Sequence, residues 1–409
     1  MSMQSIQALL LLSTWPSPVR AQVMDPSWNL SGHAIAAATF SSLNETGDDG
    51  PVDDWKTRTW LACFLVNTTL STAVGASPLI RAPDDLSGIA VTLHKLQLPG
   101  DFGVHVDLQR QVARLHAFVV ADRISGANLS IISMLEHDLD LLRQQNERTW
   151  SDQLEIMLQK AKLVLFASTV VALRKKCKHS AHTSMDRKSF LQMIASKALQ
   201  ATVELIGAFS KMLDHHFPER SPPSGDQDYV PPNCMPKFYM LALVIAVFFL
   251  PHYWNSPYCD SSMERSSIQN HIRDALHILR RCSRHPTDEP ARAAAVLDLL
   301  SSHSFASEMQ VDNRQAASFC FDGLRKAAKL RGRPSVRDEP IRQVMPDMPE
   351  QTTPSQQVTS TDFLPADWFS DSGSQQGGVI DPFDQTWGHL FFDTFDGVPD
   401  GIDDILPQL

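Results

Sequence analysis

Basic residues are absent from the end of this chain: no lysine or arginine lies between Gln343 and Leu409. Of the 46 acidic residues, 12 lie in this stretch, whereas all 36 basic residues precede it. The rest of the 409-residue chain therefore has a net charge of about +2, too little to give strong general affinity for nucleic acid. An acidic tail on a near-neutral body is typical of an interaction tail.

Cysteines are few and scattered, and no Cys-x-x-Cys pair occurs. A zinc site needs clustered ligands to fill four coordination positions, so we expect no metal or other cofactor in this chain. Sparse thiols also favour a reducing compartment. The six cysteines are Cys63, Cys177, Cys234, Cys259, Cys282 and Cys320.

Motifs of the common catalytic sites are also missing. The sequence contains no G-x-S-x-G, G-x-G-x-x-G, G-x-x-x-x-G-K-[ST] or H-E-x-x-H pattern, which argues against the corresponding hydrolases, nucleotide-binding enzymes and metalloproteases. We therefore expect no enzymatic activity. A helical enzyme that uses none of these motifs stays open as an alternative.

Long hydrophobic runs are short of membrane length. The longest, Phe238–Leu250, has fewer than the ~18 residues of a membrane span and predicts a buried core helix, with no membrane partner. The N-terminal "SIQALLLLST" resembles a signal peptide, but no basic residue precedes Arg20. A secretory signal normally begins with such residues, so we do not favour secretion.

Helical periodicity is what the sequence does have. Apolar residues recur at spacings of three and four in several segments, while the strict alternation of strands is hard to find. We predict an all-α fold: a multi-helix domain over 1–335, followed by a disordered acidic C-terminal tail over 336–409. The proline-rich stretch Phe217–Pro236 predicts a linker inside the helical part. The clearest stripes contain Leu108, Val112 and Leu115; Leu154, Met157, Ala161 and Val164; Ile194, Ala198, Leu205 and Phe209; and Ile268, Ile272, Leu276 and Leu279.

Three segments among residues 3–100 follow one another in a recognisable order: "SIQALLLLS" from Ser5, "SWNLSGHAIAAA" over 27–38 and "RTWLACFLVNTTLSTAVGASPLI" over 58–80. This order resembles the regulatory (middle-homology, fungal-specific) domain of fungal zinc-cluster transcription factors. The resemblance implies a helical scaffold without catalytic residues that represses or relays an effector signal. The matching positions are Trp28, Gly32, Ala34, Ile35, Ala38, Arg58, Trp60, Ser71, Gly75, Pro78 and Ile80.

The sequence departs from that family in several places. Leu61 replaces a second tryptophan, Asn67 stands where the family favours aspartate, and "GASP" at 75–78 replaces Gly-Arg-Pro. The family's DNA-binding module, a six-cysteine cluster that holds two zinc ions, is missing from this sequence. The resemblance thus implies zinc only if such a cluster lies upstream, and DNA contact only through a missing module or a partner factor.

One short motif could touch DNA directly. Arg331, Gly332, Arg333 and Pro334 form an Arg-Gly-Arg-Pro core, and an extended Arg-Gly-Arg segment can insert both guanidinium groups into a narrow A·T minor groove. Four residues are a weak signal. A nuclear-import patch or a solvated helix end is the favoured interpretation of this basic segment.

The acidic tail alternates carboxylates with bulky apolar side chains. Mutual repulsion between carboxylates keeps the apolar groups in water, where they are free to dock into a coactivator groove as a short helix forms. The alternative is that the tail packs back onto the body as an edge helix. The predicted anchors are Trp368, Phe369, Phe391, Phe392, Phe395, Ile405 and Leu406.

These features together predict a nuclear regulator of transcription in a fungus, acting as an activator of a limited gene set. We expect a transcriptional coactivator as partner and include a homodimer among the assemblies to be tested. The first alternative is a cofactor or repressor that makes no DNA contact of its own.

Overall fold

Helices form the whole regular structure that the computed structural model describes. The described residues are 2–16, 25–44, 54–96, 98, 100–121, 129–179, 185–217, 232, 235–259, 261–303 and 314–332. Within these ranges lie twelve α-helices, two short 3-10 helices and no strand, which confirms the all-α prediction. The tail from Gln343 onwards lies outside the described residues, as does the proposed boundary at 335/336.

The helices are numbered in chain order. They are α1 (Met3–Thr14), α2 (Ser27–Phe40), α3 (Asp54–Val74), α4 (Pro83–Lys95), α5 (Phe102–Ala121), α6 (Leu129–Gln145), α7 (Asp152–His179), α8 (Met185–His216), α9 (Lys237–Trp254), α10 (Ser262–Cys282), α11 (Glu289–Ser302) and α12 (Ser318–Leu330), with 3-10 turns η2 (Glu147–Thr149) and η4 (Gln315–Ala317).

Local sequence explains where several helices start. Ser261 accepts a hydrogen bond from the Glu264 backbone N–H at 3.0 Å, so α10 begins with a Ser-x-x-Glu cap. Asp288 caps α11 by accepting from the Ala291 N–H at 2.9 Å, and Pro290 follows in the first turn. Each cap satisfies a backbone donor that the helix cannot satisfy itself.

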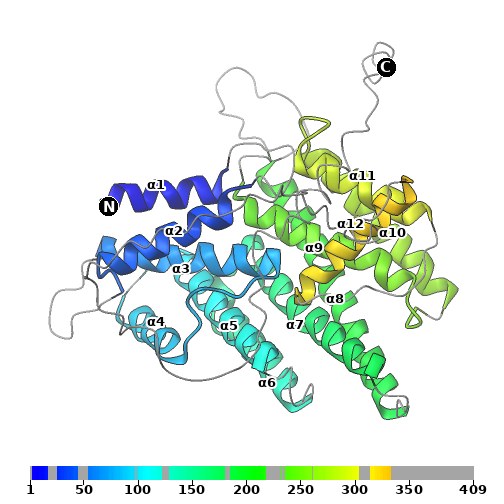
Figure 1. The fold of residues 1–409 in the computed structure, drawn as a ribbon, viewed down its shortest axis with the longest axis horizontal. Coiled ribbons are helices and arrows are strands. Elements are labelled where there is room, and N and C mark those ends of the chain that lie inside the picture. Colours follow the sequence, from blue (N-terminus) through cyan, green and yellow to red (C-terminus); the bar gives the residue numbers. More distant parts are fainter. Residues whose placement is uncertain are drawn as a thin grey trace, which may run out of the picture.

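Figure 1 shows the arrangement of the helices around two long central ones. The helices α7 and α8 pack side by side along most of their length, and α9 lies against both. On one side α1, α2 and α3 stack in order, and on the other α10, α11 and α12 gather around α9. Helices α3 and α12 are therefore both in contact with α9.

Two hydrophobic clusters make up the core. The larger one contains residues of every helix from α5 through α12, and the smaller one contains residues of α1 through α5. All the predicted stripe residues are buried in the larger cluster, apart from Leu154, which is buried but not assigned to it. Leu241 of α9 belongs to the smaller cluster, whereas most of α9 belongs to the larger one, so α9 connects the two.

The helix α9 confirms the prediction of a buried core helix. It has 18 residues, and of these 15 are buried, including Pro251 near its end. By length and composition, this helix and the Asp152–Arg174 part of α7 could each cross a membrane, but 83% and 89% of their most apolar windows are buried within the fold. Burial of this kind is typical of core helices.

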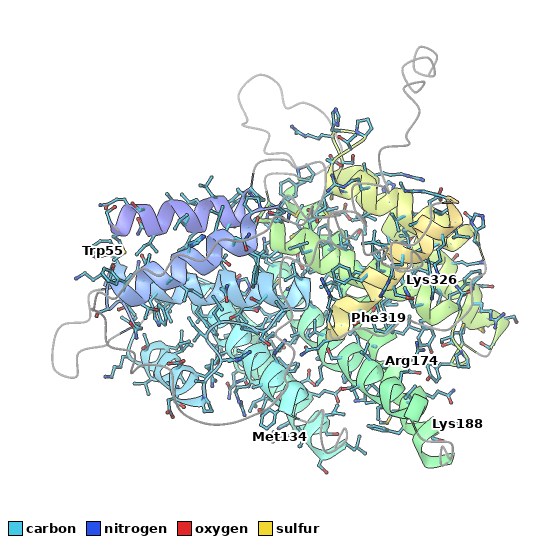
Figure 2. All side chains as sticks on the ribbon, in the orientation of Figure 1. Trp55, Met134, Arg174, Lys188, Phe319 and Lys326 are labelled. Carbon is cyan, nitrogen blue, oxygen red and sulfur yellow. The ribbon has the colours of Figure 1, made fainter. Side chains whose placement is uncertain are left out.

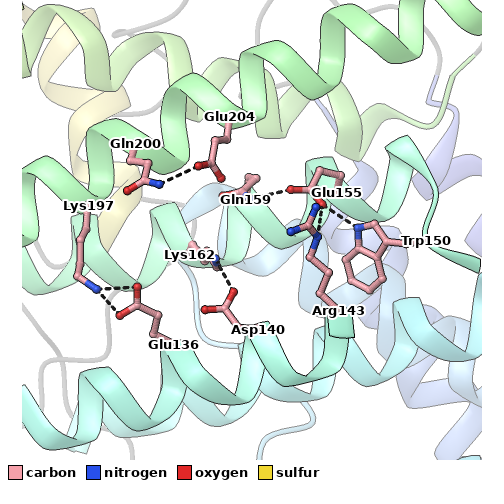
Figure 3. Close-up of polar contacts among 10 residues, drawn as sticks. All are labelled: Glu136, Asp140, Arg143, Trp150, Glu155, Gln159, Lys162, Lys197, Gln200 and Glu204. Atoms are coloured by element: carbon pink, nitrogen blue, oxygen red, sulfur yellow. Dashed lines mark hydrogen bonds and ion pairs between the residues drawn. The ribbon is translucent and has the colours of Figure 1, made fainter. Parts of the chain in front are cut away.

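A belt of polar contacts fastens α6 to α7 and α8 (Figure 3). Asp140 pairs with Lys162 at 2.6 Å, and Arg143 pairs with Glu155 at 3.0 Å. The Trp150 indole N–H donates to the same Glu155 carboxylate at 2.8 Å. Partly exposed ion pairs of this kind contribute up to about 1 kcal/mol each, so they orient α6 more than they stabilise the fold.

Candidate functional site

Most predicted site residues fall at or beyond the edge of the described chain. The seven tail anchors lie outside the described residues, and so do Arg333 and Pro334. Arg331 and Gly332 are described, and they end α12: the Gly332 N–H donates to the Lys329 carbonyl at 3.0 Å, with a φ of +73°. A left-handed glycine at this place is a common helix terminator. Minor-groove binding by the Arg-Gly-Arg-Pro core stays a prediction.

Two of the matching positions, Trp28 and Ser71, belong by contrast to one hydrogen-bonded network with Asn67. Trp28 donates its indole N–H to the Ser71 hydroxyl at 3.1 Å. Asn67 donates its amide N–H to the Ser31 hydroxyl at 3.0 Å and accepts from the Leu79 backbone N–H at 3.1 Å. Ser31, Asn67 and Ser71 are all buried. The network thus joins α2, α3 and the turn after α3.

Asn67 is the centre of this network, which gives a physical meaning to a departure from the family pattern. Its amide both donates and accepts, whereas an ionised carboxylate only accepts. Asn67 also lies in an N-x-S/T sequon, but it is 1% exposed, so in the folded chain its side chain is inaccessible for glycosylation. Hydrogen bonding inside the fold is the role that the structure gives this residue.

At Gly75 the end of α3 packs against the C-terminal part of the body. The φ of Gly75 is +71°, a region that favours glycine. A Cβ atom placed on it would lie 2.5 Å from the Arg314 carbonyl oxygen and 3.0 Å from the Ala317 Cβ. The backbone after α3 therefore lies directly against the segment that leads into α12. Glycine is required here for both conformation and space.

A buried charged group holds α12 on α9 (Figure 2 labels Phe319 and Lys326 on α12). His252 Nε2 lies 2.9 Å from Asp322 Oδ2, and its Nδ1 lies 2.8 Å from the Phe248 carbonyl oxygen. Lys326 Nζ lies 2.8 Å from the same Asp322 oxygen. Burial raises the pKa of Asp322, but the hydrogen bonds and charges of His252 and Lys326 outweigh it and lower the pKa to about 2. Asp322 is therefore ionised at neutral pH.

A buried lysine lies between α3, α5 and α7. Lys160 is 4% exposed, and its Nζ donates to the Thr69 carbonyl at 3.1 Å. Burial lowers the pKa of Lys160 to about 7, and burial together with the Lys160 charge lowers the pKa of His105 to about 4. Both groups lie deep in the core, out of reach of a macromolecular partner.

The tryptophans and glycines in and beside the matching segments differ in their surroundings. Trp28 and Trp60 are half-buried, whereas Trp55 at the start of α3 is 48% exposed. At Gly32 an added Cβ would lie 3.7 Å from Leu79 Cδ1, an ordinary van der Waals distance. Of the two matching glycines, only Gly75 has a tight contact.

Sequence reasoning missed the His252–Asp322 pair and buried Lys160. Each joins residues far apart in the chain, by 70 positions for His252 and Asp322 and by 91 for Lys160 and Thr69. For the first pair, the sequence offered one indication, the acid Asp322 on the buried face of α12. In the described parts of the chain, no group of three or more His, Cys, Asp or Glu side chains could hold a metal ion.

Comparison with known proteins gives one informative similarity. The chain is 29% identical over 173 residues to Regulatory protein LEU3 of Saccharomyces cerevisiae. The match covers 40% of this chain and 19% of that protein, so the chain corresponds to about a fifth of its length. No family model matches the chain, and no solved structure matches it. The similarity to a fungal regulatory protein is consistent with the resemblance of the first hundred residues to fungal transcription factors.

Proposed function

We propose that this chain regulates transcription in a fungal nucleus, as an activator of a limited gene set. The observation that carries the proposal is the similarity to Regulatory protein LEU3 over 173 residues. The resemblance of residues 3–100 to a fungal transcription-factor domain points to the same class of function. The acidic, aromatic tail adds a chemical means of activation.

The mechanism we propose has two parts. The tail anchors bind a coactivator groove through apolar contacts, while the surrounding carboxylates keep them in water beforehand. The helical body controls when the tail is available, because α12 is the last described helix before the tail. DNA contact would come from an upstream zinc-cluster module or from a partner factor.

Absence of catalysis is part of the proposal. Lys160, His105 and Asp322, three of the groups with shifted pKa values, are each buried and face another part of the fold. Their pKa values follow from burial and local charge rather than from an accessible site. The similar yeast protein is a regulatory protein, which also favours a non-enzymatic role.

The decisive experiment fuses residues 343–409 to an unrelated DNA-binding domain and measures a reporter. We expect activation, and we expect it to be lost when Trp368, Phe369, Phe391, Phe392 and Phe395 are replaced by alanine, because each buried anchor contributes on the order of 1–3 kcal/mol to docking. Repeating the substitutions in the full chain tests the same anchors in their natural setting.

Charge variants provide the matched control. Asp393→Asn with Asp396→Asn should only weaken activation, mainly through slower electrostatically steered association. Lysine at both positions should weaken it further. A silent tail, or full activity of the alanine set, would contradict the activator proposal and leave the cofactor or repressor alternative in the lead.

That alternative has one observation in its favour. The chain before Gln343 has a net charge of about +2, which offers little counterion release on DNA. In this alternative the body acts on a promoter through another protein. Capture of a DNA-bound partner by the full chain, without DNA binding by the chain itself, would support it.

A further inference from the structure

A small cavity lies where α3, α9, α11 and α12 meet. Its volume is about 80 Å³. The wall from α3 is formed by Ala73 and Val74, immediately before Gly75. The wall from α12 contains Cys320, Phe321 and Leu324. Residues of α9 and α11, including Val244, Ala293 and Val296, complete the lining. The cavity therefore touches helices that are far apart in the chain.

The interior of the cavity is apolar. Val244, Val296 and Leu324 present only hydrocarbon to it. Cys320 adds a thiol whose pKa burial raises to about 12, so this group is neutral at physiological pH. An apolar cavity of ~150 Å³ in another protein stays dry and binds benzene or xenon. A cavity of about half that size suits a smaller apolar guest.

The charged residues at the rim have partners within the protein. Glu289 lines the cavity and pairs with Lys237 at 3.5 Å, and Lys237 also pairs with Asp25. Arg292 donates to the Thr287 carbonyl oxygen and lies close to the charges of Glu289 and Asp288. The charged residues of the lining, Glu289 and Arg292, are thus each engaged by neighbouring groups. An anionic guest would have to compete with these contacts for Arg292.

We propose that this cavity is a binding site for a small uncharged apolar molecule. Such a guest would contact α12 on one side and α3, α9 and α11 on the others. A molecule that binds only when α12 is docked stabilises the docked state by mass action. Occupancy is therefore coupled to the attachment of α12. The site itself does not depend on the transcriptional proposal.

Xenon is the neutral probe for the test, applied to the full chain under gas pressure. We expect methyl NMR shifts at Val244, Val296 and Leu324, a higher midpoint of thermal unfolding and slower hydrogen exchange in Ser318–Leu330. The matched controls are two identical substitutions on α11. Ala293→Leu fills the cavity and should abolish all three responses. Ala294 is buried but does not line the cavity, so the Ala294→Leu variant should retain the three responses.

Propionate is the anionic probe of comparable apolar size. It should produce no saturable shift at these methyl groups. The proposal fails if xenon leaves the three methyl signals of the unmodified chain unchanged, or if Ala293→Leu responds like the parent. Saturable propionate binding that is stronger than that of xenon would also overturn it, because the site would then select an anion. The measurement on the unmodified chain decides the question even if a variant does not fold.

Discussion

The imidazole of His252 lies between two acceptors, the Phe248 carbonyl oxygen at 2.8 Å and the Asp322 carboxylate at 2.9 Å. The same carboxylate lies 2.8 Å from the Lys326 Nζ. His252 and Asp322 side chains are each 3% exposed. The attachment of α12 to α9 thus includes a buried hydrogen bond to an ionised carboxylate rather than apolar packing alone.

We predict that Asp322→Asn destabilises the body by roughly 3–5 kcal/mol, because the largely buried Lys326 ammonium loses the carboxylate that compensates its charge. Denaturant unfolding would measure the loss. The exposed acid Asp298 of α11 is the control, and Asp298→Asn should have little effect. A loss in Asp322→Asn no larger than that of the control would contradict this role of the Asp322 carboxylate.

The same carboxylate should contribute a pH dependence. Its pKa is about 2 in the folded protein and near 3.8 ordinarily, so the unfolded chain holds more protons between these values. The free energy of unfolding should therefore fall as pH falls from about 4 towards 2. Comparing the parent with Asp322→Asn over this range isolates the contribution, which the variant should lack.

Lys160 should give a pH dependence of the same sign at neutral to alkaline pH, but its charged form costs stability, whereas the charged form of Asp322 adds it. Its pKa is about 7 in the folded protein against an ordinary 10.5, so between these values the unfolded chain holds more protons and stability rises with pH. Lys160→Met should raise the free energy of unfolding at pH 6–7 by a few kcal/mol, and the gain should shrink towards pH 10. Lower stability than the parent at pH 6 would contradict this.

Two measurements sharpen the Lys160 prediction. Lys162→Met on the same helix removes a partly exposed lysine paired with Asp140 and should give no gain. In Lys160→Met the imidazole of His105 should titrate at higher pH than in the parent, because one of the two causes that lower its pKa is gone. NMR titration of His105 reads this directly.

Gly75→Ala is predicted to destabilise more than Gly332→Ala. Both glycines have a similar positive φ, +71° and +73°, which costs a non-glycine residue roughly 1–2 kcal/mol. Only at Gly75 would the added Cβ clash, at 2.5 Å from the Arg314 carbonyl oxygen; at Gly332 nothing lies within 4 Å. Overpacking should add about 1–3 kcal/mol at Gly75. Equal losses of stability in the two variants would show that the backbone around Gly75 shifts and relieves the clash at little cost.

DNA binding gives the last prediction. Residues 1–340 should bind specific duplex DNA weakly, because the net charge is small. Any remaining affinity should favour A·T tracts and disappear in Arg331→Ala/Arg333→Ala, as measured by fluorescence anisotropy at a fixed salt concentration. Tight, sequence-selective binding that survives this double substitution would reveal a DNA-reading surface elsewhere in the body.

The helices were predictable because their information is local. The spacing of Ile268, Ile272, Leu276 and Leu279 alone indicates which face of α10 is buried, and the structure buries all four. The junctions between helices were not predictable in the same way. Asp322 is an ordinary acid in its own helix, and only the placement of α12 against α9 gives it His252 as a partner. Lys160 likewise lies among polar neighbours in sequence but reaches α3 in the fold.

The sharing of α9 between two hydrophobic clusters bears on how this chain could be divided. Leu241 packs with the N-terminal helices, while Phe248 and Phe249 pack with the C-terminal ones. A fragment that lacks α9 would expose apolar surface from both clusters at once, and a fragment that ends before it would lack a wall of the smaller one. The two ends of the body are therefore expected to melt in a single cooperative transition rather than as autonomous folding units.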